Sequence, residues 1–323
     1  MAGLRGGVVT LAEIADALEA RVPGGVTRDA RIAEFTTYRV GGPAAVLVRV
    51  ANEAALREVA AVLACPQPPV LIIGRGSNLL VAEAGFPGVG LVLDGAFEEV
   101  NVDAQSGLVR AGGATALPVL ARRAAAAGVG GLEFFVGIPG SVGGAVKMNA
   151  GGHGRETSDV LVRVWLFDVF GAPDAPIGER AASDLALAYR HSNVGPAHVV
   201  VSAEVVGEPD DVASCEARIA EIVRWRREHQ PGGSNAGSIF QNPPNDSAGR
   251  LIDAAGLKGL RVGGAFVSPK HANFFQAEPG ATADDVAQLV ETVRERVAAT
   301  MGVALVPELR MVGFPHRDQE DDG

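Results

Sequence analysis

Glycine is concentrated in two segments of the chain, and its backbone freedom limits what those segments can form. Residues 74–80 (GRGSNLL) directly follow a short β-branched run, Val70–Ile73, and residues 137–152 (GIPGSVGGAVKMNAGG) are too rich in glycine to form one regular element throughout. Glycines after a strand let backbone N–H groups approach a phosphate. Each segment by itself is better explained by an ordinary turn. Together in one β-rich region, they predict a pyrophosphate held between two lobes.

Neither segment matches a standard nucleotide-binding loop. A dinucleotide fold uses G-x-G-x-x-G at the start of a helix, and the third glycine is missing after Gly74 and Gly76. The second segment contains no GK[ST], so it is not a P-loop. The phosphate prediction therefore depends on the two segments acting together.

The rest of the chain alternates strand patterns with amphipathic helices, which predicts an α+β fold. Strands are predicted at 44–50, 70–73, 90–93, 107–111, 160–169, 185–190, 198–206 and 307–312. Helices are predicted at 53–64, 118–127, 211–229, 247–255 and 283–301, with Asn52 and Thr282 as N-caps of the first and the last. The pattern places boundaries near residues 95 and 213, and the charged segment from Phe314 onward is predicted to be disordered.

Composition and charge exclude several classes of protein. A chain of 323 residues with 47% hydrophobic content can form two or three domains with real cores. Its formal net charge of −10 argues against nucleic-acid binding, although a few arginines in one pocket can hold a small anion. No segment resembles a signal peptide or a membrane span, so a cytoplasmic protein is expected. Cys65 and Cys215 lack the spacing of a disulfide framework or a zinc site, and both are predicted to be buried.

Six motifs, in a fixed order, resemble those of one family. They are GRGSNLL (74–80), GLEFFVGIPGSVGGAVKMNAGG (131–152), AYRHS (188–192), NAGSIFQNP (235–243), GRLIDAAGLKGLRVGGAFVSPKHANFF (249–275) and PELRMVG (307–313). From about residue 37 to residue 313, the chain resembles the UDP-N-acetylenolpyruvoylglucosamine reductases of bacterial peptidoglycan-precursor synthesis, also called UDP-N-acetylmuramate dehydrogenases. One such motif matches easily by chance, but six in order do not.

The resemblance implies a two-lobed FAD-binding domain of the vanillyl-alcohol-oxidase type (residues 1–94 and 95–213), followed by a smaller α+β substrate-binding domain (residues 214–313). It also implies non-covalent FAD, NADPH as hydride donor and a UDP-sugar as substrate, with no nucleic acid, membrane insertion or obligatory protein partner. Flavin contacts are implied for Gly74, Arg75, Gly76, Ser77, Asn78, Leu79, Gly137, Ile138, Pro139, Gly140, Ser141, Gly143, Gly144, Asn149 and Gly151. Substrate contacts are implied for Tyr189, Asn242 and His271.

The resemblance also assigns catalytic roles to three residues. Hydride addition to the enolpyruvyl group leaves a carbanion beside the substrate carboxylate; Ser238 would protonate it, and Arg190 and Glu308 would stabilise the enolate. A guanidinium fork matches a carboxylate, and a serine hydroxyl can act as an acid toward an acceptor as basic as a carbanion. Glu308, expected in a strand within an apolar run, should be either protonated or paired with Arg310. The alternatives are a surface arginine at a strand end and a serine that caps a turn.

Several positions depart from the family pattern. Gln241 stands where many relatives carry a basic residue, Gln276 where asparagine is common, and His229 where lysine often stands. Arg190 and Ser238 are only 48 residues apart, which resembles a shorter subclass that lacks a substrate-covering tyrosine loop. Tyr38 and Tyr189 are the only tyrosines, so no such lid residue can be assigned.

Two other functions remain open at this point. One is a different FAD enzyme of the same superfamily, such as an oxidase of alcohols or hydroxy acids. Several of these attach flavin covalently through a histidine, but the first histidine in this chain is His153, beyond the first glycine segment. The other is a flavin-binding regulatory protein without catalysis, against which the presence of all three catalytic residue types argues.

Overall fold

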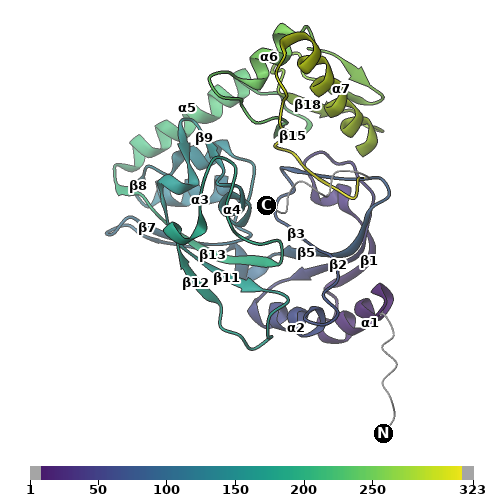
Figure 1. Ribbon diagram of the computed structural model, residues 1–323. Coiled ribbons are helices and arrows are strands. Elements are labelled where there is room, and N and C mark those ends of the chain that lie inside the picture. The colour runs from purple at the N-terminus through teal and green to yellow at the C-terminus, as the bar shows by residue number, and fades with distance from the viewer. Residues whose placement is uncertain (1–8, 315–323) are drawn as a thin grey trace.

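The computed structural model describes residues 9–314, and in them two lobes with their own sheets are followed by a C-terminal domain (Figure 1). Helices and strands are interleaved throughout, so the α+β prediction is confirmed. Phe314, which we assigned to the disordered tail, has only 7% of its surface exposed and packs in the C-terminal core. The rest of that predicted tail, residues 315–323, lies outside the described residues.

The first lobe is a four-stranded sheet with two helices on one face (Figure 1). Its elements are α1 (Leu11–Arg21), β1 (Val26–Arg31), η1 (Ile32–Phe35), β2 (Pro43–Val50), α2 (Glu53–Leu63), β3 (Val70–Ile73), β4 (Leu79–Val81) and β5 (Phe86–Leu93). The sheet order is β1-β2-β5-β3, with β1 antiparallel to β2 and the other pairs parallel. Asn52 caps α2 as predicted, because its side chain accepts from the amide of Ala55 at 2.9 Å.

The second lobe is built on a five-stranded antiparallel sheet in the order β12-β11-β13-β7-β6. Its elements are η2 (Gly95–Glu98), β6 (Val100–Asp103), β7 (Leu108–Gly112), α3 (Leu117–Ala126), β8 (Val129–Gly130), η3 (Glu133–Gly137), α4 (Val142–Met148), β9 (Gly151–Gly152), β10 (Arg155–Glu156), η4 (Thr157–Asp159), β11 (Leu161–Asp168), β12 (Gly178–Ala181), η5 (Ala182–Leu185), β13 (His198–Val206) and β14 (Glu208–Pro209). The two lobes share a hydrophobic core, in which Phe97, Phe167 and Val199 of the second lobe join the helices and sheet of the first.

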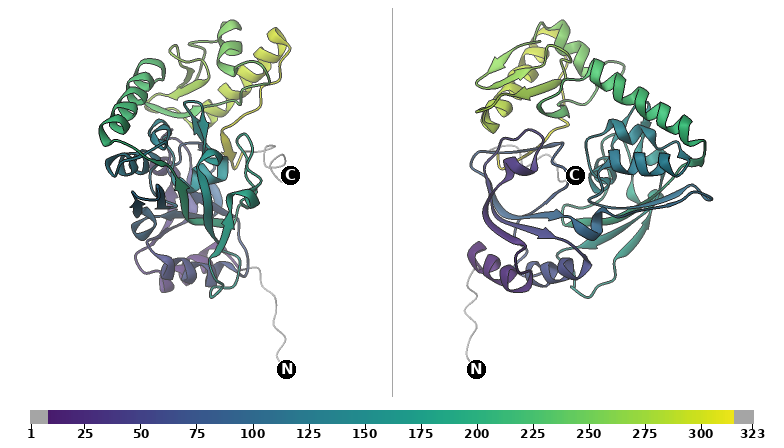
Figure 2. Two further views of the ribbon diagram at one scale, coloured as in Figure 1. Left: turned by 90° about the vertical axis from the view of Figure 1, so that its left-hand side faces the viewer. Right: turned by 180° about the vertical axis from the view of Figure 1, so that it is seen from behind.

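The long helix α5 (Val212–His229) extends from the second lobe to the C-terminal domain (Figure 2). Cys215 and Ile219 belong to the core of the second lobe, and Arg218 pairs with the buried Glu133 through two bonds of 2.9 and 2.7 Å. The helix therefore packs as part of the second lobe, and a separate core begins at Ala236.

The C-terminal domain is a four-stranded antiparallel sheet covered by two helices. Its elements are β15 (Ser234–Ser238), α6 (Ala248–Ala254), β16 (Arg261–Val262), β17 (Ala265–Val267), β18 (Phe274–Ala277), α7 (Ala283–Met301) and β19 (Arg310–Val312). Thr282 caps α7 as predicted. The chain then returns to the first lobe, because β19 pairs in parallel with β4. Tyr38 of the first lobe is fully buried in this domain's core, and its hydroxyl donates to the carbonyl of Phe275 at 3.0 Å.

Most predicted elements are present with shifted ends, but one is wrong. Residues 185–190 do not form a strand: η5 ends at Leu185, and a turn follows in which Ala186 and Arg190 have φ values of +47° and +56°. Left-handed backbone cannot continue a strand, so the turn replaces it. The closing strand is also shorter than the predicted 307–312, since β19 covers only Arg310–Val312.

Two expectations about burial and membranes can also be compared with the structure. Cys215 is buried as predicted, but Cys65, which follows α2 closely, is exposed, so that half of the prediction is wrong. Among the described residues, no helix has the length and apolar character needed to cross a membrane.

Candidate active site

The first glycine segment is the loop between β3 and β4, and glycine is required there by the protein itself. Gly76 has φ +57°, and a Cβ on it would lie 2.0 Å from the carbonyl oxygen of Phe35. The amide of Thr37 donates to the carbonyl of Gly76 at 3.1 Å, which holds the loop against residues 35–37. A side chain at Gly76 would therefore collide with the protein backbone itself.

As predicted, the second glycine segment does not form a single regular element. Its first part lies against the first loop. Residues 137–141 leave η3 and enter α4, whose N-cap is Ser141. A Cβ on Gly74 would lie 2.5 Å from Ser141 Oγ, and one on Gly140 would lie 3.5 Å from Ser77 Oγ. The two loops are therefore in contact across the lobes, which is the arrangement that we predicted for a pyrophosphate site.

Backbone donors on the two loops are available to a ligand. Within the described part of the chain, the amides of Arg75, Gly76, Ser77, Asn78, Gly140 and Ser141 donate no hydrogen bond to another residue. Of these residues, Gly76 and Ser141 are buried, where an unpaired amide is costly, and clustered amides of this kind bind anions well. The donor set therefore fits the pyrophosphate of FAD.

The other predicted flavin positions lie in varied surroundings. Leu79 begins β4 and is buried, Ile138 packs on the core of the second lobe, and Gly143 and Gly144 form the first turn of α4. Pro139, before Gly140, is exposed. Gly137 faces the ring of His153, and Gly151 faces the carbonyl of Arg155, since a Cβ at either position would lie 2.7 Å from that neighbour.

The side chain of Asn149 is engaged in hydrogen bonds with the protein. It ends α4 with φ +40°, and only 1% of its surface is exposed. Its Nδ2 donates to Glu156 Oε2 at 2.9 Å and to the carbonyl of Ala188 at 3.1 Å, and its Oδ1 accepts from the amide of Ser158 at 2.8 Å. Both side-chain donor hydrogens thus serve the protein.

The predicted catalytic residues Arg190 and Glu308 form an ion pair. Arg190 Nε donates to Glu308 Oε1 at 2.7 Å, and their side chains are 17% and 15% exposed. The expected partner Arg310 is not the one that Glu308 uses, and Glu308 precedes β19 instead of lying in a strand. Burial raises the pKa of the Glu308 carboxyl, while Arg190 acts in the opposite direction. This carboxyl is accordingly easier to protonate than an exposed one.

Ser238 is linked to Glu308 through the backbone of the next residue, Ile239. It ends β15, where it pairs with Phe274 of β18, and the carbonyl of Ile239 accepts from the amide of Glu308 at 2.7 Å. Ile239 and Phe240 are both buried. In the part of the chain that the structure describes, the Ser238 hydroxyl makes no hydrogen bond. The hydroxyl is therefore not engaged in capping a turn.

Asn78 connects the first glycine loop to Glu308. Its Nδ2 donates to the carbonyl of Glu308 at 2.9 Å, and its own carbonyl accepts from the amide of Arg310 at 3.3 Å. A residue predicted to touch the flavin thus also holds the segment that carries the predicted catalytic carboxyl.

The three predicted substrate residues lie along one series of contacts. The Arg190 guanidinium lies 4.8 Å from the centre of the exposed Tyr189 ring, and the Tyr189 hydroxyl accepts from the amide of Asn242 at 3.5 Å. Asn242 Oδ1 accepts from Ala248 at the start of α6. A Cβ on the next residue, Gly249, would lie 3.3 Å from the His271 ring.

His271 continues this series toward Ser238. Its ring makes an edge contact with Phe274, the residue that pairs with Ser238. Burial, followed by the positive charge of Lys258, lowers the pKa of the imidazole, whereas a backbone hydrogen bond opposes the shift. A neutral imidazole can accept a hydrogen bond from a uridine or sugar group without requiring an anion.

The departures from the family pattern have defined positions. Gln276 Nε2 donates to the carbonyl of Gly232 at 2.8 Å, and the backbone N–H of Gln241 donates to the carbonyl of Val306 at 2.9 Å. The His229 ring stacks on Trp225, with centroids 4.7 Å apart. Glu156, which sequence reasoning missed, lies near Arg190; no local pattern marks it, because only the fold brings residues 156 and 190 together.

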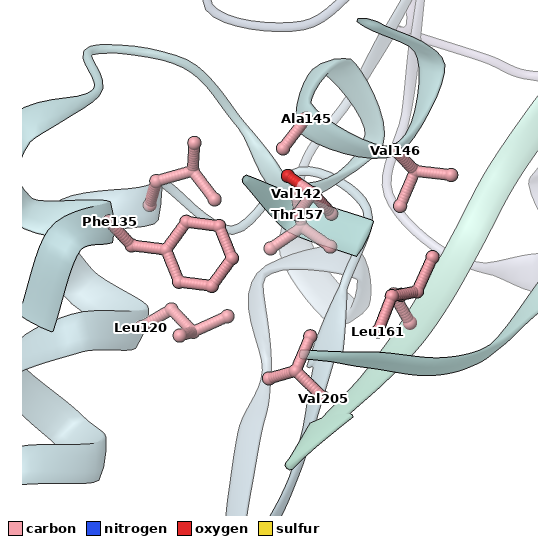
Figure 3. Close-up of a pocket in the computed structure, with 10 residues that line it drawn as sticks. Leu120, Phe135, Val142, Ala145, Val146, Thr157, Leu161 and Val205 are labelled. Carbon is pink, nitrogen blue, oxygen red and sulfur yellow. The ribbon is translucent and has the colours of Figure 1, made fainter. Parts of the chain in front are cut away.

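A small cavity lies away from these residues. It has a volume of about 10 Å³, lies in the core of the second lobe, and is lined by side chains such as Leu120, Phe135 and Leu161 (Figure 3). Thr157 is the one polar residue of its lining, and its hydroxyl is already bonded to the carbonyl of Ala150 at 2.8 Å. This space is a packing void of the size of one water molecule.

Comparison with known proteins agrees with this arrangement. Residues 44–171 match the model of an FAD binding domain, and residues 229–312 match that of the UDP-N-acetylenolpyruvoylglucosamine reductase C-terminal domain. The chain is 45% identical to the UDP-N-acetylenolpyruvoylglucosamine reductase of Acidiphilium cryptum over 92% of this chain and 94% of that protein. It is 41% identical to an enzyme of that name from Methylorubrum extorquens, over 94% of this chain and 98% of the relative.

A solved structure extends the agreement to the fold. The UDP-N-acetylenolpyruvylglucosamine reductase of Thermus caldophilus superposes with a TM-score of 0.76 at 37% identity, covering 89% of this chain and 98% of that one. Sequence identity above 40% over nearly the whole length, together with this fold, assigns the chain to one protein family. The chain belongs to the UDP-N-acetylenolpyruvoylglucosamine reductase family.

Proposed function

We propose that this protein catalyses the NADPH-dependent, FAD-mediated reduction of UDP-N-acetylenolpyruvoylglucosamine to UDP-N-acetylmuramate in peptidoglycan-precursor synthesis. Family membership supports the reaction, and one structural observation supports it most directly: Arg190 pairs with Glu308, whose backbone bonds both Ile239, the residue after Ser238, and Asn78 of the first glycine loop. A non-catalytic flavin protein would have no need for this convergence.

FAD, when bound, supplies two-electron chemistry between NADPH and the substrate. The amides of the two glycine loops would hold its pyrophosphate, as described above. The substrate carboxylate is an anion, and Arg190 is the partly buried cation that can bind it through its terminal nitrogens while its Nε remains with Glu308.

Protonation of the substrate at C2 requires a donor that is positioned and not otherwise engaged. Ser238 is the proposed donor: its hydroxyl has no hydrogen-bond partner among the described residues, and the next residue, Ile239, is bonded to the Glu308 amide. Glu308 in its protonated form would donate a hydrogen bond to the enolate, which its raised pKa favours.

Substrate specificity is proposed to lie on the adjoining surface of the C-terminal domain, where Tyr189, Asn242 and His271 follow one another. Of the two tyrosines, Tyr38 is fully buried and Tyr189 is 45% exposed, so Tyr189 alone is accessible to a ligand. Membership of the shorter subclass, cytoplasmic location and the lack of a protein partner stay predictions.

The decisive experiment follows the flavin by absorbance under anaerobic conditions. NADPH should bleach the purified holoenzyme, and the enolpyruvyl UDP-sugar should then restore the colour. If oxygen restores the colour faster than the UDP-sugar does, the protein is an oxidase; if NADPH never bleaches it, the proposed reaction is wrong.

A further inference from the structure

The turn that carries Arg190 is anchored on the end of α4, the helix that follows the second glycine loop. The Ser192 hydroxyl donates to the carbonyl of Lys147 at 2.8 Å, and Lys147 Nζ contacts the carbonyl of Val194. Asn149, at the end of the helix, donates to the carbonyl of Ala188. The Arg190 turn is thus held from both sides by the last residues of α4.

Asn149 also holds a second carboxylate next to Arg190. Its Nδ2 bonds Glu156 Oε2 at 2.9 Å, and the other oxygen, Oε1, lies 3.9 Å from Arg190 Nη1. Arg190 therefore lies between Glu308 on its Nε side and Glu156 on a terminal nitrogen. A left-handed φ at Arg190 makes its backbone costly to hold, so the position depends on such external contacts.

We propose that Asn149 and Glu156 are positioning residues for Arg190, acting as one unit in the step that involves the substrate carboxylate. This inference rests on the proposed function. It also moves Asn149 from the flavin contacts, where its motif had placed it, to the substrate side of the site.

The physical argument concerns the direction of the guanidinium. Glu308 alone fixes only Nε, and a second carboxylate at the far nitrogen fixes the plane of the fork. The 3.9 Å between Glu156 Oε1 and Arg190 Nη1 is too long for a strong hydrogen bond. The substrate anion can therefore bind Nη1 without breaking a short contact between Arg190 and Glu156. Misplacement of a catalytic group by about 1 Å can cost up to about 10²-fold in rate.

The test uses holoenzyme and measures the two half-reactions separately. Glu156→Gln keeps the length of the side chain and an oxygen for Asn149 but removes the charge. Asn149→Gly removes the bonds to both Glu156 and Ala188 and suits the left-handed backbone at that position. Each variant should keep its flavin and be bleached by NADPH within about twofold of the parent rate. Flavin oxidation by the UDP-sugar should slow about 10-fold or more.

Asn193→Ala is the matched control. Asn193 lies just after the Arg190 turn, and its Nδ2 donates to the carbonyl of Asp184 at 2.8 Å. It thus loses one bond from an asparagine side chain to a carbonyl, as the Asn149 variant does, but none to Glu156. It should leave both half-reactions unchanged. The double variant of Asn149 and Glu156 should be no slower than the slower single variant, since residues that act as a unit are not additive.

The outcomes separate this inference from the proposed function. If the parent flavin is not oxidised by the UDP-sugar, the proposed function itself fails. With an active parent, loss of flavin or equal slowing of both half-reactions in Asn149→Gly returns Asn149 to a cofactor or purely structural role. Parental oxidation rates in Glu156→Gln overturn the positioning role even if the Asn149 variant does not fold.

Discussion

Arg190 and Glu308, 118 residues apart in the sequence, are joined by a bond of 2.7 Å between Nε and Oε1 in a site where both side chains are mostly buried. The pair connects the second lobe to the segment that returns from the C-terminal domain. It also places a guanidinium beside a carboxyl of raised pKa, a combination that can stabilise negative charge developing on a ligand.

Replacement of Arg190 by lysine should not be conservative. An ammonium cannot hold Glu308 through one nitrogen and a substrate carboxylate through two others in a plane. Loss of a charged hydrogen-bond pair costs about 1.5–3 kcal/mol, or roughly 10–160-fold in rate. Stopped-flow absorbance should show this loss in flavin oxidation by the UDP-sugar, with bleaching by NADPH preserved. Equal losses in both half-reactions would make the role of Arg190 structural.

Ser238→Ala should slow the same oxidation step by about 10²–10⁴-fold, the usual contribution of a general acid. Because the hydroxyl has no partner among the described residues, thermal stability and flavin content should not change. Ser238→Cys should recover part of the rate, since a thiol is also a donor. An Ala variant whose flavin is oxidised at the parental rate would transfer the acid role to Glu308 or to a bound water.

The pH dependence of flavin oxidation should report on Glu308. The folded-state pKa of this carboxyl is raised by burial, so it carries its proton to higher pH than an exposed glutamate, and it loses the proton as pH rises through that value. The rate of oxidation by the UDP-sugar should therefore fall across this range. Glu308→Gln carries an amide donor at every pH and should lack this fall, whereas persistence of the fall in the variant would assign it to another group.

Two glycines of the loops should respond differently to alanine. Gly76→Ala should lower stability by more than about 1 kcal/mol, because φ is positive and the new Cβ meets Phe35. Gly140→Ala should fold with nearly the parental melting temperature, since the nearest atom, Ser77 Oγ, is 3.5 Å away. Its affinity for FAD, measured by flavin fluorescence titration of the apoprotein, should nevertheless fall. Unchanged affinity would show that the pyrophosphate does not approach Gly140.

Acid denaturation should release all of the flavin into the supernatant. His153 is the first histidine of the chain, and it packs against Gly137 of the second segment and not in the first glycine loop. Cys65 follows α2 and is exposed. Yellow colour that stays with the precipitated protein would contradict non-covalent binding.

Features with a short-range cause could be predicted from the sequence. The caps Asn52 and Thr282 and the strand Val70–Ile73 were identified correctly because their residues interact with neighbours a few positions away. The six ordered motifs were sufficient to indicate the family through their resemblance to it, and the two glycine segments were sufficient to predict a phosphate-binding site, because glycine's backbone freedom is a property of the residue type.

The tertiary structure alone determined which of these residues meet. Glu308 pairs with Arg190 and not with Arg310, and Asn149 faces Glu156, because contacts across more than a hundred residues, or across a turn, depend on how the lobes pack. The strand predicted up to Arg190 is a left-handed turn, which α4 holds through the carbonyl of Ala188. Residue types supplied the chemistry of the site, and long-range packing, which leaves no local pattern, supplied its geometry.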